Sequence, residues 1–172
     1  GKAGGNGYAI TAVIGTREIM NVAQSTFISS TFWTERIGPT AALKTLEVME
    51  KSRSWELITQ IGKRIGEQWE SLGKKYQVPI KVNGLPSMIG FIIQSNDWLK
   101  YKTYITQEML KNNILASNVI YVCTKHGQSE IDNYFQVLEP IFNTIGACEN
   151  SDLSIDSLLD GPTSHGGFKR LN

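Results

Sequence analysis

Apolar residues recur at three- and four-residue steps between Ser52 and Tyr76, a spacing that predicts an amphipathic helix with one buried stripe. The stripe comprises Trp55, Ile58, Ile61, Ile65, Trp69, Leu72 and Tyr76. The other face carries the charged residues Lys63, Arg64, Glu67, Glu70 and Lys74, and we interpret it as solvent-exposed. This helix is the clearest element that the sequence predicts.

Beyond Pro79 the pattern alternates between short apolar runs and helical spacing. It predicts, in order, a strand over 80–82, a strand over 88–94, a helix over 98–110, a strand over 119–123 and a helix from Ser129. Asn83–Pro86 is a turn signal, and Ser129–Asp132 resembles a capping box. We expect Pro140 to kink or shorten the last helix. Together these elements predict a small α+β domain followed by an irregular tail after Cys148.

The first part of the chain is less regular. Residues 9–14 and 26–32 are rich in β-branched and apolar residues and predict strands, with one or two helical turns over 17–24 between them. Gly38-Pro39 then opens a helix that continues to Lys51, since proline is tolerated in a first helical turn.

Composition narrows the class of protein. The 172 residues are 41% hydrophobic, which excludes a disordered chain. The formal net charge of +1 gives no general reason to expect a nucleic acid or an anionic membrane as partner. Two cysteines are too few for a disulfide framework and fit a cytoplasmic, reducing setting. No metal-ligand spacing is present; Cys123 is interpreted as a core residue and His126 as a loop residue.

The glycine-rich opening is the first candidate for chemistry. It lacks the spacing of a phosphate-binding P-loop, because Lys2 is followed by Ala3 rather than by Ser or Thr. A lysine beside flexible glycines can instead serve as a Schiff-base amine, provided that partial desolvation lowers its pKa. Taken alone, Lys2 is better interpreted as an ordinary surface lysine.

The second candidate is the segment 29–39, in which four hydroxyls and an arginine precede a helix N-terminus. Hydroxyls and helix ends suit a phosphate or a carboxylate. The alternative is a simple strand-to-helix connection with capping hydroxyls.

Taken together, the two segments resemble a known family. Gly1–Ile10 is similar to the pyridoxal-phosphate lysine segment of class III aminotransferases. Thr31-Phe32, followed by Gly38-Pro39-Thr40-Ala41-Ala42, resembles the family's later threonine-aromatic segment and the helix after it. Within the family the likeness is greatest to the glutamate-1-semialdehyde aminomutase branch, and the region from Ile114 onward resembles its small C-terminal domain.

The resemblance implies a role for individual residues. Lys2 would form the internal aldimine with pyridoxal phosphate and then act as the general base. Thr31 would donate a hydrogen bond to the cofactor phosphate, with Ser30 as a neighbouring helper. In the family this threonine serves the cofactor of the adjacent subunit, so the resemblance implies a homodimer with a shared active site.

Two departures from the family pattern matter. Trp33–Ile37 lengthens the loop that in most relatives leads directly into Gly-Asn-Pro, and Glu35 and Arg36 are therefore our candidates for substrate contacts. The arginine with which many members grip an α-carboxylate has no counterpart between Gly84 and Cys148. This weakens a generic α-amino-acid substrate and leaves room for the aminomutase-like branch.

The resemblance also implies a domain organisation. We expect an α/β chain that is the C-terminal part of a fold-type I transferase, because the family's phosphate loop and pyridine-nitrogen aspartate are not found. Residues 1–51 would finish the large cofactor domain, 52–76 would bridge, and 77–172 would form the small domain. The implied reaction is amino-group transfer or intramolecular amino exchange, with the chain inactive alone. The alternatives are a related decarboxylase or racemase, and a non-enzymatic α+β interaction module.

Overall fold

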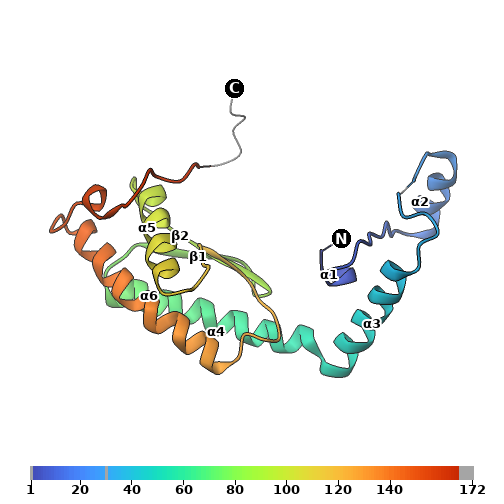
Figure 1. Ribbon diagram of the computed structural model, residues 1–172, viewed down its shortest axis with the longest axis horizontal. Coiled ribbons are helices and arrows are strands. Elements are labelled where there is room, and N and C mark those ends of the chain that lie inside the picture. The colour runs from blue at the N-terminus through green and yellow to red at the C-terminus, as the bar shows by residue number, and fades with distance from the viewer. Residues whose placement is uncertain (1, 30, 167–172) are drawn as a thin grey trace. The chain divides into compact units, whose positions relative to one another are not determined.

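The computed structural model describes residues 2–29 and 31–166, and it divides the chain into two compact units, residues 1–54 and 55–172 (Figure 1). The first unit contains α1 (Lys2–Gly5), α2 (Arg17–Val22), η1 (Ala23–Ser25) and α3 (Ile37–Ser52). The second is built from α4 (Ser54–Lys75), β1 (Ile80–Leu85), β2 (Met88–Ile93), α5 (Trp98–Lys111), β3 (Val119–Tyr121), α6 (Gln128–Glu149) and η2 (Ile155–Leu158). No helix among the described residues has both the length and the apolar character needed to cross a membrane.

An antiparallel sheet in the order β1-β2-β3 forms the centre of the second unit. Its middle strand is almost entirely apolar, and Ile89, Phe91 and Ile93 are buried at alternate positions, as the period-2 geometry of a strand requires. The Trp69 and Phe142 rings pack against Phe91 with centroid distances of 4.8 and 6.0 Å. The core therefore lies where α4 and α6 meet this strand.

Helices α4 and α6 lie side by side and run in the same direction. Arg64 pairs with Asp132 at 3.3 Å, Trp69 Nε1 donates to the Tyr134 hydroxyl at 3.1 Å, and the Tyr76 hydroxyl donates to Glu139 at 2.9 Å. The partners advance together along both helices, which fixes the parallel direction. The predicted apolar stripe accounts for this packing, because Ile65 and Trp69 belong to it and are almost fully buried.

The second unit follows the sequence prediction, with differences at the hairpin turn and in the helix α6. The sequence predicts the hairpin turn over Asn83–Pro86. The structure places it at Pro86-Ser87, because the pairing of β1 with β2 continues as far as Leu85 and Met88. The predicted capping box at Ser129 is wrong: α6 begins at Gln128, with Gly127 as its N-cap. Pro140 does not shorten α6, since the helix continues to Glu149 and buries Ile141, Phe142 and Ile145 beyond it. That burial offsets the roughly 3 kcal/mol cost of an internal proline.

The first unit departs further from the prediction. The helical turns over 17–24 and the helix after Gly38-Pro39 are confirmed, but the strands predicted over 9–14 and 26–32 are wrong. A strand needs a neighbour to complete its hydrogen-bond ladder, and the described part of residues 1–54 contains no strand. Large apolar side chains remain exposed here, including Ile14 at 89% and Phe27 at 95%.

Candidate functional site

Lys2 opens the short helix α1, and its side chain is exposed. The helix ends in a left-handed turn, with φ of +47° at Asn6 and +111° at Gly7, and the Tyr8 N–H donates to the Gly5 carbonyl at 3.2 Å. Gly7 suits this turn because glycine adopts positive φ without steric cost. The glycine-rich turn that the sequence predicts after the lysine is therefore present.

Thr31 begins the turn that leads to α3, and it is exposed. The Glu35 N–H donates to the Phe32 carbonyl at 3.0 Å and closes this turn. Ser30, predicted as a helper of the threonine, lies outside the described residues.

Glu35 and Arg36, our candidates for substrate contacts, occupy different environments. The Glu35 carboxylate accepts the N–H groups of Ile37 and Gly38 at 2.5 and 3.0 Å, so it is engaged at the start of α3. Arg36 is exposed at the N-cap position, and its carbonyl accepts the Thr40 N–H at 3.0 Å. Glu35 thus has a structural engagement that the sequence reasoning missed, because glutamate is not one of the usual N-capping residues.

The lysine segment and the start of α3 are in contact. A Cβ placed on the buried Gly38 would lie 2.6 Å from the Ala9 carbonyl oxygen and 3.3 Å from Ile10 Cβ. A Cβ on Gly5 would lie 2.8 Å from Ile10 Cγ2. Ile10 therefore sits between two glycines, one from each candidate segment, and the absence of their side chains allows this approach. The two segments that carry the family resemblance fold against each other.

The second unit contains a separate hollow of about 510 Å³ beside β3 and the start of α6. Its lining is mainly apolar, with His126 and Glu130 among its polar residues. Hydrogen bonds from its own backbone N–H and from the Ser129 hydroxyl hold the pKa of Glu130 below its ordinary value.

Cys123, predicted to be a core residue, is exposed, and its N–H donates to His126 Nδ1 at 3.3 Å. Within residues 2–29 and 31–166, no cluster of three or more His, Cys, Asp or Glu side chains could hold a metal ion.

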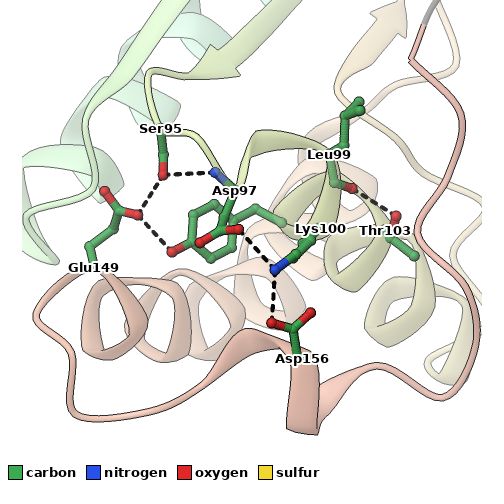
Figure 2. Close-up of polar contacts among 8 residues, drawn as sticks. Ser95, Asp97, Leu99, Lys100, Thr103, Glu149 and Asp156 are labelled. Atoms are coloured by element: carbon green, nitrogen blue, oxygen red, sulfur yellow. Dashed lines mark hydrogen bonds and ion pairs between the residues drawn. The ribbon is translucent and has the colours of Figure 1, made fainter.

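A polar cluster lies where α5 begins and α6 ends (Figure 2). The Glu149 carboxylate accepts the hydroxyls of Ser95 and Tyr101 at 2.8 and 2.6 Å. Burial, and then the bond to Glu149, raises the pKa of Tyr101 above its ordinary value. Lys100 lies between Asp97 and Asp156 at 3.1 and 2.7 Å, and its hydrogen bonds to these carboxylates raise its pKa. Each charged group here faces an opposite charge or a hydrogen-bond donor, which indicates a structural cluster.

The chemistry of the first unit fits pyridoxal phosphate in part. Lys2 provides an exposed primary amine for the aldehyde, and Thr31 provides an exposed hydroxyl for the phosphate. Both side chains are exposed among the described residues of the first unit. The donor set therefore fits the cofactor in chemical type.

Comparison with known proteins gives a consistent result. Residues 1–126 match the family described as Aminotransferase class-III. The chain is 31% identical over 137 residues to a 3-aminobutyryl-CoA aminotransferase of Cloacimonas acidaminovorans, a match that covers 76% of this chain and 33% of that protein. It is 29% identical over 102 residues to a glutamate-1-semialdehyde 2,1-aminomutase of Hyperthermus butylicus, covering 57% of this chain and 24% of the relative. The chain thus spans about a third of the length of such relatives.

Solved structures show the same fold. The Sphingopyxis FumI protein, in its PLP internal aldimine form, matches with a TM-score of 0.76 and 18% identity, over 92% of this chain and 39% of that one. A transaminase with PLP bound matches with a TM-score of 0.61 and 17% identity, over 73% of this chain and 31% of that one. The predicted fold class, part of a fold-type I transferase with mixed helix and sheet, is confirmed. Pyridoxal phosphate is the cofactor that these comparisons indicate.

Proposed function

Because this chain belongs to the class III aminotransferases, we propose that it carries the lysine and threonine that bind the cofactor of a pyridoxal-phosphate-dependent transaminase. The observation that carries the proposal is the packing of Ile10 between Gly5 and Gly38. This contact folds the segment after Lys2 against the helix that follows Thr31. The resemblance assigns Lys2 to the cofactor of its own subunit and Thr31 to the cofactor of the adjacent subunit, and the packing supports the placement of both segments in one cofactor domain.

In this proposal Lys2 Nζ would hold the cofactor through its aldehyde, and the same amine would act as the general base for the proton on the substrate's α-carbon. The Thr31 hydroxyl donates to the phosphate, and Ser30 assists it. When bound, pyridoxal phosphate supplies an electron sink for the carbanion. Arg36 remains our candidate for a substrate contact, since its exposed guanidinium can pair with a carboxylate or a phosphate.

The complete active site requires more than this chain in our proposal. The family's pyridine-nitrogen aspartate and phosphate loop are not found in the sequence, so we expect no turnover from these residues alone. The exposed Phe27 and Trp33 of the first unit support a second subunit as partner, as a homodimer with a shared active site would need. Two cysteines without a disulfide support a cytoplasmic setting.

Intramolecular amino exchange is the second candidate reaction. It is favoured by the aminomutase among the relatives and by the lack of arginine between Gly84 and Cys148. Transfer consumes a separate amino acceptor, whereas exchange leaves the substrate's composition unchanged. Product analysis with and without an added oxo acid, on a protein that contains this chain, separates the two.

The proposed role of Lys2 can be tested on a dimeric protein that contains this chain. We expect pyridoxal phosphate followed by borohydride to label Lys2 in preference to other lysines, as measured by peptide mass spectrometry. Lys2→Ala should abolish the dominant label, whereas Lys44→Ala, which removes an exposed lysine paired with Glu47 on α3, should leave it intact. Uniform labelling of exposed lysines would overturn the proposed role of Lys2.

A further inference from the structure

Glu35 lies at the junction between the turn that carries Thr31 and the helix α3. Its backbone N–H donates to the Phe32 carbonyl at 3.0 Å and closes the turn. Its carboxylate accepts the N–H groups of Ile37 and Gly38 at 2.5 and 3.0 Å. One residue therefore fixes the turn through its backbone and the helix through its side chain.

The helix end explains why a carboxylate is useful at this place. The first N–H groups of a helix have no partner within the helix, and the helix dipole places about half a positive charge there. Glu35 satisfies two of these N–H groups and brings a negative charge to the same end. An anion from outside the chain would have to displace it.

The other side of the junction is also fixed. Gly38, whose N–H binds Glu35, is buried against Ala9 and Ile10, with only 2.6 Å between its would-be Cβ and the Ala9 carbonyl oxygen. Ala9 and Ile10 follow the turn that ends the Lys2 helix. The start of α3 is thus packed on the lysine segment, and the Thr31 turn is attached to that start through Glu35.

We propose that Glu35 is a positioning residue, which holds the Thr31 hydroxyl in place for the cofactor phosphate instead of contacting the substrate. This inference rests on the proposed function, because it presupposes that Thr31 binds the phosphate. Glu35 lies in Trp33–Ile37, the stretch that lengthens this loop relative to the family pattern. The carboxylate of Glu35 would therefore stabilise a connection that is longer than in most relatives.

The test compares pyridoxal phosphate with pyridoxal, which has the same aldehyde and lacks the phosphate. For each we would measure the dissociation constant of Lys2 capture by borohydride trapping and mass spectrometry. We expect Glu35→Ala to reduce the preference for the phosphorylated form about tenfold, the equivalent of one charge-assisted hydrogen bond, and to leave pyridoxal capture unchanged. Glu35→Gln should recover part of the preference, because its amide oxygen can still accept an N–H.

Glu47→Ala is the matched control, since Glu47 is an exposed glutamate on α3 whose carboxylate accepts hydrogen bonds from Lys44. It should keep the wild-type preference. Equal loss of pyridoxal and pyridoxal phosphate capture in Glu35→Ala would overturn the proposal, because it would indicate general loss of structure. Tighter phosphate binding in Glu35→Ala would overturn it as well, because Glu35 would then be screening the helix end.

If the proposed function itself is wrong, the result differs from a failure of the positioning role, because the wild type then captures neither compound. If the wild-type chain captures neither compound at Lys2, nuclear magnetic resonance decides the role of Glu35 without the cofactor. We then expect Glu35→Ala to shift the backbone resonances of Thr31 and to speed amide exchange at Ile37 and Gly38. Unchanged Thr31 resonances would overturn the positioning role.

Discussion

The two units of this chain contain similar apolar patterns and use them differently. In residues 55–172, large apolar side chains such as Trp69, Phe91 and Phe142 are completely buried. In residues 1–54, Phe27 is 95% exposed and Leu43 70% exposed, although the latter lies on a regular helix. The second unit therefore carries its own core, whereas the apolar residues of the first have few neighbours within the described structure.

The packing of the helices shows that the second unit is the part of the chain that its own contacts stabilise. Most of the stability of a helix in a protein comes from packing of its apolar face. Helix α4 packs its apolar face on the sheet and α6, whereas α3 buries only Gly38. The second unit thus buries its own apolar surface, whereas the described residues of the first unit leave much of theirs exposed.

The largest expected difference in stability comes from replacing one phenylalanine by alanine in each of the two units. Phe91→Ala should lower the free energy of unfolding of the second unit by about 3–5 kcal/mol, because it removes a ring at the centre of the core. Phe27→Ala should change stability by less than about 0.5 kcal/mol, because its ring is already in solvent. Urea denaturation followed by tryptophan fluorescence measures both.

If Phe91→Ala does not fold, Phe91→Leu serves as the milder variant and should still destabilise more than Phe27→Ala. Equal effects of the Phe91 and Phe27 variants would contradict the distinction between a closed core and an open surface.

Glycines provide a second comparison, with a smaller expected effect. A Cβ on Gly62 of α4 would collide with the Pro86 carbonyl in the β1-β2 turn, so Gly62→Ala should destabilise the second unit by about 1–3 kcal/mol. A Cβ on Gly4 of α1 meets nothing within 4 Å, and Gly4→Ala should be neutral or stabilise by up to about 1 kcal/mol. Thermal unfolding followed by circular dichroism measures the difference, and a destabilising Gly4→Ala would show that α1 is packed more tightly than its exposure indicates.

The same contrast explains how much of the fold the sequence predicts. In the second unit, periodicity identifies the elements correctly. The apolar stripe from Trp55 to Tyr76 and the apolar run of β2 both pack against other parts of that unit. Residues 9–14 have a composition typical of a strand, but a strand requires a ladder partner that local composition does not specify. Boundary shifts, such as Gly127 in place of Ser129 as N-cap of α6, are of one or two residues, the range within which helix ends are least well defined.

The candidate site is predictable to a similar extent. Lys2 and Thr31 come from the resemblance, and their roles stay predictions. The contact of Ile10 with Gly5 and Gly38 could not be found from spacing, because it joins positions that are far apart in the chain. The sequence predicts Glu35 as a substrate contact, and this stays a prediction; only the structure shows its carboxylate at the Ile37 and Gly38 N–H groups. The predicted boundaries at 51 and 76 remain untested, although Ile65 and Trp69 place α4 in the core of the second unit.

The smallest expected effect concerns the polar contacts that complete the second unit. Tyr101 is buried and donates to Glu149, and its raised pKa means that the folded state holds the phenol proton more tightly than the unfolded state does. The resulting stabilisation is fully present below the ordinary value of 10.0 and is lost as the pH rises beyond it. Tyr101→Phe should cost about 1–2 kcal/mol at neutral pH, because Glu149 loses a donor, and it should flatten the fall in stability above pH 10. Urea midpoints between pH 7 and about 11 test this linkage, and a Tyr101→Phe profile as steep as that of the wild type would assign the alkaline loss to other groups.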